Sequence, residues 1–462
     1  MLSLWLINAM ASDTNQTSRL SLAQQIGWAA GTHGTSTMIG VLITIMLSYL
    51  TTVLGIEAAI AGAIIFASRL YDLVIDPLMG HVSDRTVSKL GRRRVYLLWG
   101  ALASFVTFVL LFNVPDIADA TLRVVYVAVL LFLFNTAYTV FNIPYLAMPA
   151  EMTESYHERT LLMSYRVIFF TTASLLIFLG TAALTKQFGV QTGYNLFGWL
   201  IGGGMAISML VAFASSAKAP RTDRTEDVKV PLSSQIRLVF GNRPFTIYLG
   251  VKLLQLTAQA SSNAALLFFG AYVIKNQQAM LIAFGSFFPV GTFLAIPAWV
   301  WLGKRIGKRN SFMLAAVIYS AVMLTWLLAG EGEPIWSLGL RLTLLGAAVS
   351  GVLVAGFAIL PDTIEYDRRR TGINREGVYA GLYSTMEKMA AAFGPLIFGA
   401  YLSSAGFLSS QGGEVVAQPD AAVSAIYIGM AVIPAIASLL SAALLSFYDL
   451  SEEKLKATGP RN

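Results

Sequence analysis

The sequence contains no cysteine and only three histidines among its 462 residues. The absence of cysteine excludes disulfides, thiolate metal sites and cysteine nucleophiles, and three histidines leave few general bases for catalysis. The sequence also holds no nucleophile elbow, phosphate-binding loop or cluster of metal ligands. We therefore expect no enzyme, no cofactor and no bound metal.

Charged residues are scarce as well, at 12%, whereas 56% of the residues are hydrophobic. Soluble domains carry roughly 25% charged and 45–50% apolar residues, so lipid is the solvent for most of this chain. The net charge of +7 would suit nucleic acid, but the basic residues lie in short loops between apolar runs. The expected surroundings are a lipid bilayer, with no nucleic-acid partner.

Twelve apolar runs, each near the roughly 20 residues that cross a bilayer, predict an all-α membrane protein. The predicted spans are residues 22–50, 57–82, 92–113, 122–149, 160–184, 192–215, 244–274, 280–302, 311–329, 335–360, 377–404 and 421–447. A polar stretch from Lys218 to Pro231 lies almost at the midpoint. The predicted organisation is a segment of residues 1–21, a six-helix half of residues 22–215, a linker of residues 216–243, a second six-helix half of residues 244–447 and a tail of residues 448–462.

The Lys and Arg residues of the short loops predict the orientation, because they favour the cytoplasmic side. They gather in the loops that hold Arg85 to Arg94, Lys304 to Arg309 and Arg368 to Arg375. The alternate loops carry acidic residues such as Glu331 and Glu414 instead. We therefore expect a multi-pass protein of the bacterial inner membrane, with the N-terminal segment, the linker and the tail all cytoplasmic.

A weak internal repeat links the two halves. The stretch from Pro77 to Arg94, after the second span, is matched by the stretch from Pro297 to Arg309, after the eighth. Six plus six helices in parallel repeats are the major facilitator arrangement, with a solute site near mid-membrane between the halves. The expected architecture is therefore two six-helix halves around a central cavity.

Ionisable residues inside spans are costly and mark cavities or paired networks. In the second span, Arg69, Asp72 and Asp76 are spaced to share one helical face. One interpretation is a cation or proton site built from Asp72 and Asp76. The alternative is that Arg69 only neutralises Asp72 and holds helices together.

The seventh and eleventh spans also carry polar residues at positions that lipid should not tolerate. Lys252, Gln255, Gln259 and Asn263 follow helical spacing and are expected to line the same cavity, although amides can equally join helices by hydrogen bonds. In the eleventh span Glu387 and Lys388 are adjacent and cannot face one direction. We expect Lys388 to face the cavity.

Three stretches carry a family resemblance. The stretch from Gly80 to Arg94 resembles the cytoplasmic loop motif of the major facilitator superfamily, with glycines for turns and charges for ion pairs. The stretch from Arg69 to Gly80 resembles the glycoside–pentoside–hexuronide:cation symporter family, as do Asn142 to Arg166 and Pro361 to Lys388. The resemblance implies gating positions at Gly80, Asp84, Arg85, Gly91, Arg92 and Arg93.

The same resemblance places the coupling cation at Asp72, Asp76 and Thr139. The polar residue that the family has between the two carboxylates is Ile75 here. Because sodium prefers several oxygen ligands and a proton needs one carboxylate, we favour H+ over Na+ as the coupling ion.

Solute-contact positions of the family fall on Ser36, Asn142, Leu146, Arg166 and Lys388, to which the polar spacing of the seventh span adds Lys252 and Gln255. The melibiose-type members have aspartates in place of Ser36 and Asn142, so a galactoside is disfavoured. Arg166 and Lys388 would suit an anionic sugar such as a uronide. They would equally suit pairing with Asp72 or Asp76 when no solute is bound.

The prediction is a cation-coupled secondary transporter, acting as a monomer, that moves a small polar solute by alternating access. A transporter of lysolipid or another amphipathic solute is the alternative, since lysolipid carriers exist among the family's relatives. A membrane sensor or enzyme is the remote third hypothesis. The identity of the solute is not predicted.

Overall fold

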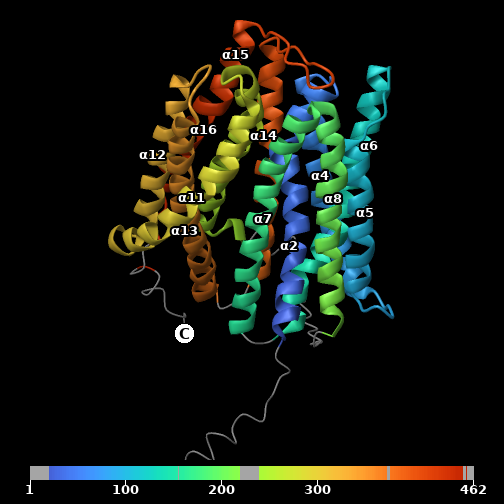
Figure 1. The fold of residues 1–462 in the computed structure, drawn as a ribbon. Helices are drawn as coiled ribbons and strands as arrows, with labels where there is room; N and C mark the ends of the chain where they lie inside the picture. Colours follow the sequence, from blue (N-terminus) through green and yellow to red (C-terminus); the bar gives the residue numbers. More distant parts are fainter. Residues whose placement is uncertain (1–19, 154–155, 219–238, 372–374, 451–453, 455–462) are drawn as a thin grey trace, which may run out of the picture.

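The computed structural model describes residues 20–153, 156–218, 239–371, 375–450 and 454. The predicted linker of residues 216–243 lies mostly outside this range, as do most of residues 1–21 and of the tail. The described residues form a bundle of long helices that run roughly side by side (Figure 1). The all-α fold class is therefore confirmed.

The first half of the bundle contains six helical segments. Their bounds are α2 (Leu22–Thr44) with α3 (Met46–Ser48) and the π-helical η1 (Tyr49–Val53), α4 (Ala58–Arg85), α5 (Arg94–Phe112), α6 (Ala120–Met152), α7 (Tyr156–Phe188) and α8 (Val190–Ser215), which is followed by the short η2 (Ser216–Lys218). Ser21 begins α2 with a capping box, in which its hydroxyl accepts from Gln24.

The second half repeats this order. Its segments are α10 (Arg243–Phe268) with η3 (Phe269–Val273), α11 (Gln277–Ile306), α12 (Lys308–Thr325) with η4 (Trp326–Leu328), α13 (Ile335–Thr371), α14 (Glu376–Ser404), and α15 (Asp420–Tyr427) with η5 (Ile428–Val432) and α16 (Ile433–Leu445). Both α2 and α10 thus end in a π-helical turn, which the hydropathy of the sequence did not predict.

Nine helices of the described residues are long and apolar enough to cross a membrane, and the bent pair of α2 with α3 and η1 makes ten. By length and hydropathy, ten of the twelve predicted spans are therefore found among the described residues. The remaining two segments are α10 and α14, which carry the polar residues Lys252, Gln255, Glu387 and Lys388. Both are packed in the middle of the bundle, where α14 contacts α4 and α10.

The packing partners of the two halves correspond. In the first half α2 contacts α7 and α8, while α5 contacts α6 and α8; in the second, α10 contacts α14 and α16, while α12 contacts α13 and α16. Between the halves, α4 packs on α14 and α7 packs on α11. This correspondence supports the duplication that the weak sequence repeat suggested.

The turns of the repeat also match in detail. Gly91 and Gly307, which precede α5 and α12, both have a positive φ, a region that favours glycine. A few residues later, Arg94 donates to the carbonyl of Phe213 at the end of α8, and Arg309 donates to the carbonyl of Ser446 at the end of α16. Each half therefore fixes its last helix with an arginine from its third segment.

Candidate functional site

A cavity of about 590 Å³ lies between the two halves and is called the central cavity below. Its walls come from α2, α6 and α7 of the first half and from α10 to α13 of the second. Its volume falls within the range of roughly 300–1,000 Å³ that small-molecule sites occupy. The predicted cavity between the halves is therefore present.

Four of the seven predicted solute-contact residues line the central cavity. They are Ser36, Asn142, Leu146 and Arg166. Gln259 and Asn263 of α10, which the polar spacing also placed in the cavity, line it from the opposite half. Both halves therefore contribute hydrogen-bonding groups to one space.

The other three predicted contacts are not on this wall. Lys252 and Gln255 are buried, and the Lys252 Nζ donates to the Gln255 Oε1 at 2.6 Å. Lys388 pairs with Asp76 instead of lining the cavity. The structure thus brings four of the predicted contacts together and leaves Lys252, Gln255 and Lys388 outside the cavity wall.

Arg166 is held in place by the first half alone. Its Nε donates to the Thr32 hydroxyl at 3.0 Å, and its guanidinium lies over the rings of Trp28 and Tyr145. These two rings stack with centroids 4.7 Å apart. None of the ion pairs between described residues involves Arg166, so its charge faces the cavity without a carboxylate partner.

The far part of the cavity is apolar and aromatic. Phe178 of α7 meets Phe284 of α11 with ring centroids 4.7 Å apart, and Phe284 stacks on Phe288. All three rings line the central cavity. A solute in this space would meet polar groups around Arg166 and aromatic faces at the contact between α7 and α11.

The first predicted carboxylate, Asp72, is fully buried. Arg69 pairs with its Oδ2 at 3.0 Å, one turn away on the same helix, and Arg69 is only 5% exposed. The Asp72 Oδ1 has no hydrogen-bond partner among the described residues. The pair is therefore local to α4 and leaves one oxygen without a donor.

The second predicted carboxylate, Asp76, has partners on two other helices. Its Oδ1 accepts from the Thr139 hydroxyl of α6 at 2.8 Å, and its Oδ2 forms an ion pair with Lys388 of α14. The side chains of Asp76 and Lys388 are 15% and 20% exposed. Because α4 and α14 belong to different halves, this ion pair joins the halves across their interface.

One turn of α6 connects the carboxylate cluster with the central cavity. Thr139 contacts Asp76, while Tyr138 and Asn142, one residue before and three after, line the cavity. A change in the charge of Asp76 can therefore reach the solute-facing residues through a single helical turn.

The halves are also joined at the end of the bundle opposite to the start of α2, at the top of Figure 1. There the backbone of the loop before α15 pairs with η1. Ser410, Gly412 and Gly413 donate to the carbonyls of Thr51, Val53 and Thr52 at 2.9–3.1 Å. We call these contacts the loop latch. The two halves are therefore joined at this end by backbone hydrogen bonds.

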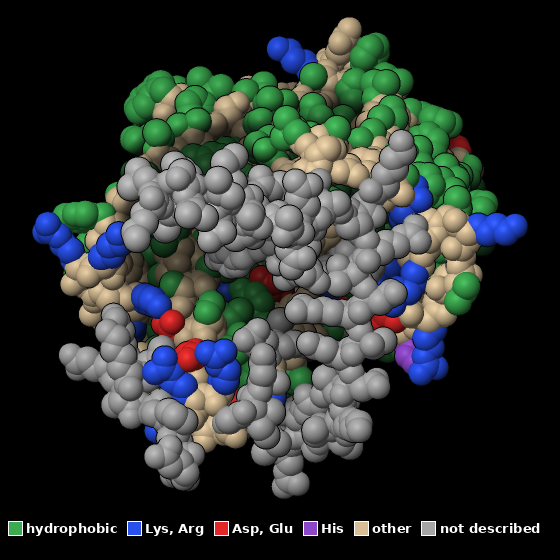
Figure 2. Space-filling model, turned by 90° about the horizontal axis from the view of Figure 1, so that it is seen from below, with side chains coloured by type: hydrophobic (Ala, Val, Ile, Leu, Met, Phe, Trp, Pro, Cys, Tyr) green, Lys and Arg blue, Asp and Glu red, His purple; other side chains and the backbone are tan. Residues whose placement is uncertain are grey.

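The predicted loop motif lies at the opposite end, where Lys and Arg side chains gather around the face (Figure 2). Arg93 pairs with Asp84 at 2.8 Å, and Gly91 turns the chain with a φ of 106°. Of the other three motif residues, Gly80 and Arg85 lie on α4, and Arg92 lies in the turn before α5. The motif therefore ties α4 to the start of α5 within the first half.

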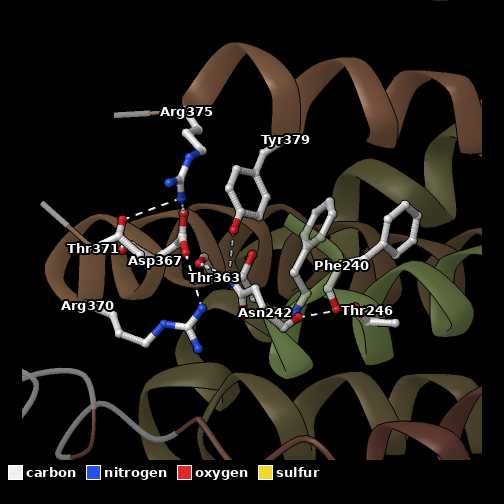
Figure 3. A network of polar contacts seen from close by, with 10 residues as sticks. Phe240, Asn242, Thr246, Thr363, Asp367, Arg370, Thr371, Arg375 and Tyr379 are labelled. Carbon is white, nitrogen blue, oxygen red and sulfur yellow. Dashed lines mark hydrogen bonds and ion pairs between the residues drawn. The ribbon is translucent and has the colours of Figure 1, made fainter. Parts of the chain in front are cut away.

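A second polar network lies at this end of the other half (Figure 3). Arg375 donates to the buried Asp367 at 2.8 Å, while the Asn242 amide donates to the Thr363 carbonyl and the Tyr379 hydroxyl at 2.9 Å each. These contacts fix the ends of α10, α13 and α14 to one another. Each half is therefore tied within itself at this end, whereas the loop latch joins the halves at the other.

Several cavity residues were missed by the sequence analysis. Tyr138, Phe178, Phe284 and Phe288 line the cavity, yet aromatic residues inside spans carry no sequence signal that separates a cavity wall from a lipid-facing or core position. Thr32 of α2 was not among the predicted site residues. Its contact with Arg166 depends on a tertiary arrangement that spacing does not reveal.

Comparison with known proteins identifies the family. The family model described as MFS/sugar transport protein matches residues 27–452. The chain belongs to this family. It is 26% identical to the uncharacterized symporter YnaJ of Bacillus subtilis (strain 168), over 95% of this chain and 94% of that protein. It is also 26% identical to the glucuronide carrier protein homolog of Escherichia coli (strain K12), over 95% and 94%.

Solved structures agree on the fold. The crystal structure of a D-xylose-proton symporter matches with a TM-score of 0.63 at 14% identity, over 94% of this chain and 98% of the other. At this identity the match shows the fold alone, which is that of the major facilitator transporters. The family model and the relatives above confirm the predicted resemblance to the glycoside–pentoside–hexuronide:cation symporters.

Proposed function

We propose that this family member is a proton-coupled symporter that carries a sugar-type solute, with a uronide as the favoured class, across the bacterial inner membrane. It acts as a monomer, since one chain forms the whole central cavity. We infer from the basic residues of the short loops that the end of the bundle that carries the loop motif faces the cytoplasm, and we expect both termini in the same compartment.

The ion pair between Asp76 and Lys388 carries this proposal. It joins α4 of one half to α14 of the other, next to the central cavity. A proton on Asp76 removes the carboxylate charge and with it the attraction to Lys388. Protonation therefore loosens the contact between the two halves, which is the step that a rocking transporter requires.

Coupling follows from the position of Thr139 and Asn142 on one turn of α6. A solute that contacts Asn142 and Arg166 changes the surroundings of Asp76, and protonation of Asp76 changes the solute site in return. Such linkage is reciprocal in free energy, so each ligand raises the affinity for the other by the same factor.

The neighbours of the two carboxylates favour a proton over sodium. Arg69 and Lys388 already supply a positive charge to Asp72 and Asp76, respectively. Sodium would have to displace Lys388 and gather several oxygens, with Ile75 providing none. A proton needs only one oxygen of Asp76.

Arg166, which forms no ion pair with another described residue, favours an anionic solute. Its planar fork of donors suits a carboxylate. The relative named as a glucuronide carrier protein homolog is consistent with this class.

Uptake into proteoliposomes tests the proposal. With an imposed inward proton gradient, labelled glucuronic acid or a labelled glucuronide should accumulate, whereas a labelled neutral pentose disaccharide should accumulate less. Arg166→Ala and Arg166→Lys should both lose uronide uptake while the protein elutes as a single folded peak. Uptake of no sugar of either class, by a folded protein, would contradict the proposal.

An amphipathic solute is the second candidate, and the aromatic part of the cavity favours it. Phe178, Phe284 and Phe288 offer a lipid chain or an apolar aglycone a surface that a free sugar does not use. A labelled lysolipid added to the same proteoliposomes separates the candidates. Lysolipid transport that is insensitive to excess uronide would favour this second function.

A further inference from the structure

A second cavity, of about 670 Å³, lies away from the central one and within the second half. It opens at the end of the bundle that carries the loop motif, between the last turns of α11, the first turn of α12, α13 and the residues after α16. We call it the α12 cavity. It shares no lining residue with the central cavity and has no part in the proposed transport path.

Three basic side chains line the α12 cavity. Lys308 is paired with Asp362 at 2.6 Å, and Arg309 donates to the Ser446 carbonyl at 2.6 Å. Lys304 is exposed, and no ion pair between described residues involves it. The Nε of Arg309 is buried and also has no partner among the described residues. Donors are therefore left over on two of the three side chains.

The first turn of α12 adds backbone donors. Its residues Lys308 to Ser311 line the cavity, and no side chain caps the helix at Gly307. The first N–H groups of a helix have no carbonyl partner within it, and the helix dipole favours negative charge at this end. Phosphate groups bind at helix N-termini for these two reasons.

An independent observation comes from Tyr448, which lines the same cavity from the chain after α16. Its side chain is only 3% exposed, and its hydroxyl has no hydrogen-bond partner among the described residues. A buried hydroxyl without a partner costs free energy, so native structures usually supply one. A ligand oxygen in the cavity would supply it here.

Two carboxylates also line the cavity, but each has a basic partner. Asp362 pairs with Lys308, and Asp449 pairs with Lys454 at 2.5 Å. The hydrogen bond from Lys454 lowers the pKa of Asp449 below its usual value, so this group stays ionised and paired. Among the described residues, the donors that remain free belong to Lys304, Arg309, Tyr448 and the first turn of α12.

We propose that the α12 cavity binds a phosphate group, supplied by an anionic phospholipid of the surrounding leaflet or by a free phosphate anion. The lipid source agrees with the surroundings. Val300 of the cavity wall and its neighbours Trp301 and Phe447 are exposed apolar side chains, as expected of a surface against acyl chains. Basic pockets between helices at the cytoplasmic face are known to hold acidic lipid headgroups.

Thermal unfolding of the purified full-length chain in detergent tests the site, because a ligand of the folded state raises the unfolding midpoint. The probes are phosphatidylglycerol, phosphatidylcholine as the lipid control, and inorganic phosphate against chloride at equal ionic strength. The variants are Lys304→Gln and Tyr448→Phe. The matched control is Arg305→Gln, which removes the neighbouring charge; Arg305 stacks on Trp301 and does not line the cavity.

Phosphatidylglycerol should raise the midpoint of the wild type and of Arg305→Gln equally, whereas each site variant should need about tenfold more lipid. The same pattern with inorganic phosphate in place of the lipid would also support the site and would assign a free anion. Without ligand, Tyr448→Phe should unfold no earlier than the wild type, because it loses only an unpartnered hydroxyl. If Tyr448→Phe does not fold, the lipid concentration that Lys304→Gln needs, compared with that of Arg305→Gln, decides whether the site exists.

Two results would overturn the proposal. One is that neither phosphate source shifts the midpoint more than its control ligand. The other is that Lys304→Gln and Arg305→Gln weaken the effect equally, which would indicate attraction to the basic surface as a whole.

Discussion

The two carboxylates of α4 lie one helical turn apart, yet their surroundings differ. Asp72 is fully buried and pairs with Arg69 of its own helix. Asp76 is partly exposed, accepts from Thr139 of α6 and pairs with Lys388 of the opposite half. An aspartate thus forms an ion pair within α4 at position 72 and an ion pair between the two halves at position 76.

This difference suggests different roles for the two carboxylates, one in stability and one in coupling. A pair within one helix keeps its geometry when the halves move, so Asp72 and Arg69 stabilise α4 in every state. A pair between α4 and α14 must break when the halves separate. We therefore propose that, of the two carboxylates, Asp76 is the one whose protonation is linked to movement, and that Asp72 supports the site from within the helix.

The largest effect is expected from Asp76→Asn. The amide cannot bind or release a proton, so accumulation driven by a proton gradient should fall by the whole coupling factor, about 5–150-fold. Downhill exchange of solute should persist, because the amide resembles the protonated acid. Counterflow and gradient-driven uptake, measured in the same proteoliposomes, check this. Asp116→Asn, at an exposed position, is the control; equal losses in both variants would contradict the assignment.

Arg69→Gln should affect stability most, since it leaves the fully buried Asp72 without its cation. Loss of one partner of a buried pair costs about 3–5 kcal/mol, which a thermal unfolding curve in detergent would reveal. The double variant with Asp72→Asn should regain most of that loss. Lys388→Gln should destabilise less, because Asp76 keeps Thr139 and some exposure. A reversed order of the two single variants would remove the distinction between the carboxylates.

Thr139→Val should have a smaller effect that concerns Asp76 alone. It removes one hydrogen bond to a charged group, worth about 1.5–3 kcal/mol. The proton concentration that half-saturates uptake should therefore shift by at least about tenfold. Thr136→Val, one turn earlier on α6, removes a hydroxyl that contacts Tyr71 instead. An equal shift from Thr136→Val would show that the effect is not specific to the carboxylate contact.

The sequence predicted much of this arrangement and missed part of it for identifiable reasons. Hydropathy gave the helical bundle, and the family resemblance gave Asp76 and Thr139, which the structure brings into contact. Helical spacing correctly put Gln259 and Asn263 on the cavity wall. The same spacing wrongly put Lys252 on that wall. Helical periodicity predicts which residues share a face of α10, but not how far along the helix the cavity extends.

Tertiary contacts account for the features that were not predicted. The loop latch uses backbone groups of Ser410, Gly412 and Gly413, and nothing along the chain identifies η1 as their partner. The partner of Lys388 was left open between solute and carboxylate, because the register of α4 against α14 decides it. Neither contact leaves a pattern along the chain.

The driving ion decides whether Asp76 couples solute movement to protons. Solute uptake into proteoliposomes should be measured with either a proton gradient or a sodium gradient, with the membrane potential held constant by potassium and valinomycin. We predict that uptake follows the proton gradient, collapses with a protonophore and barely responds to sodium. A sodium requirement without solute-dependent proton movement would contradict proton coupling, and would mean that Thr139 and other oxygens bind sodium beside Asp76.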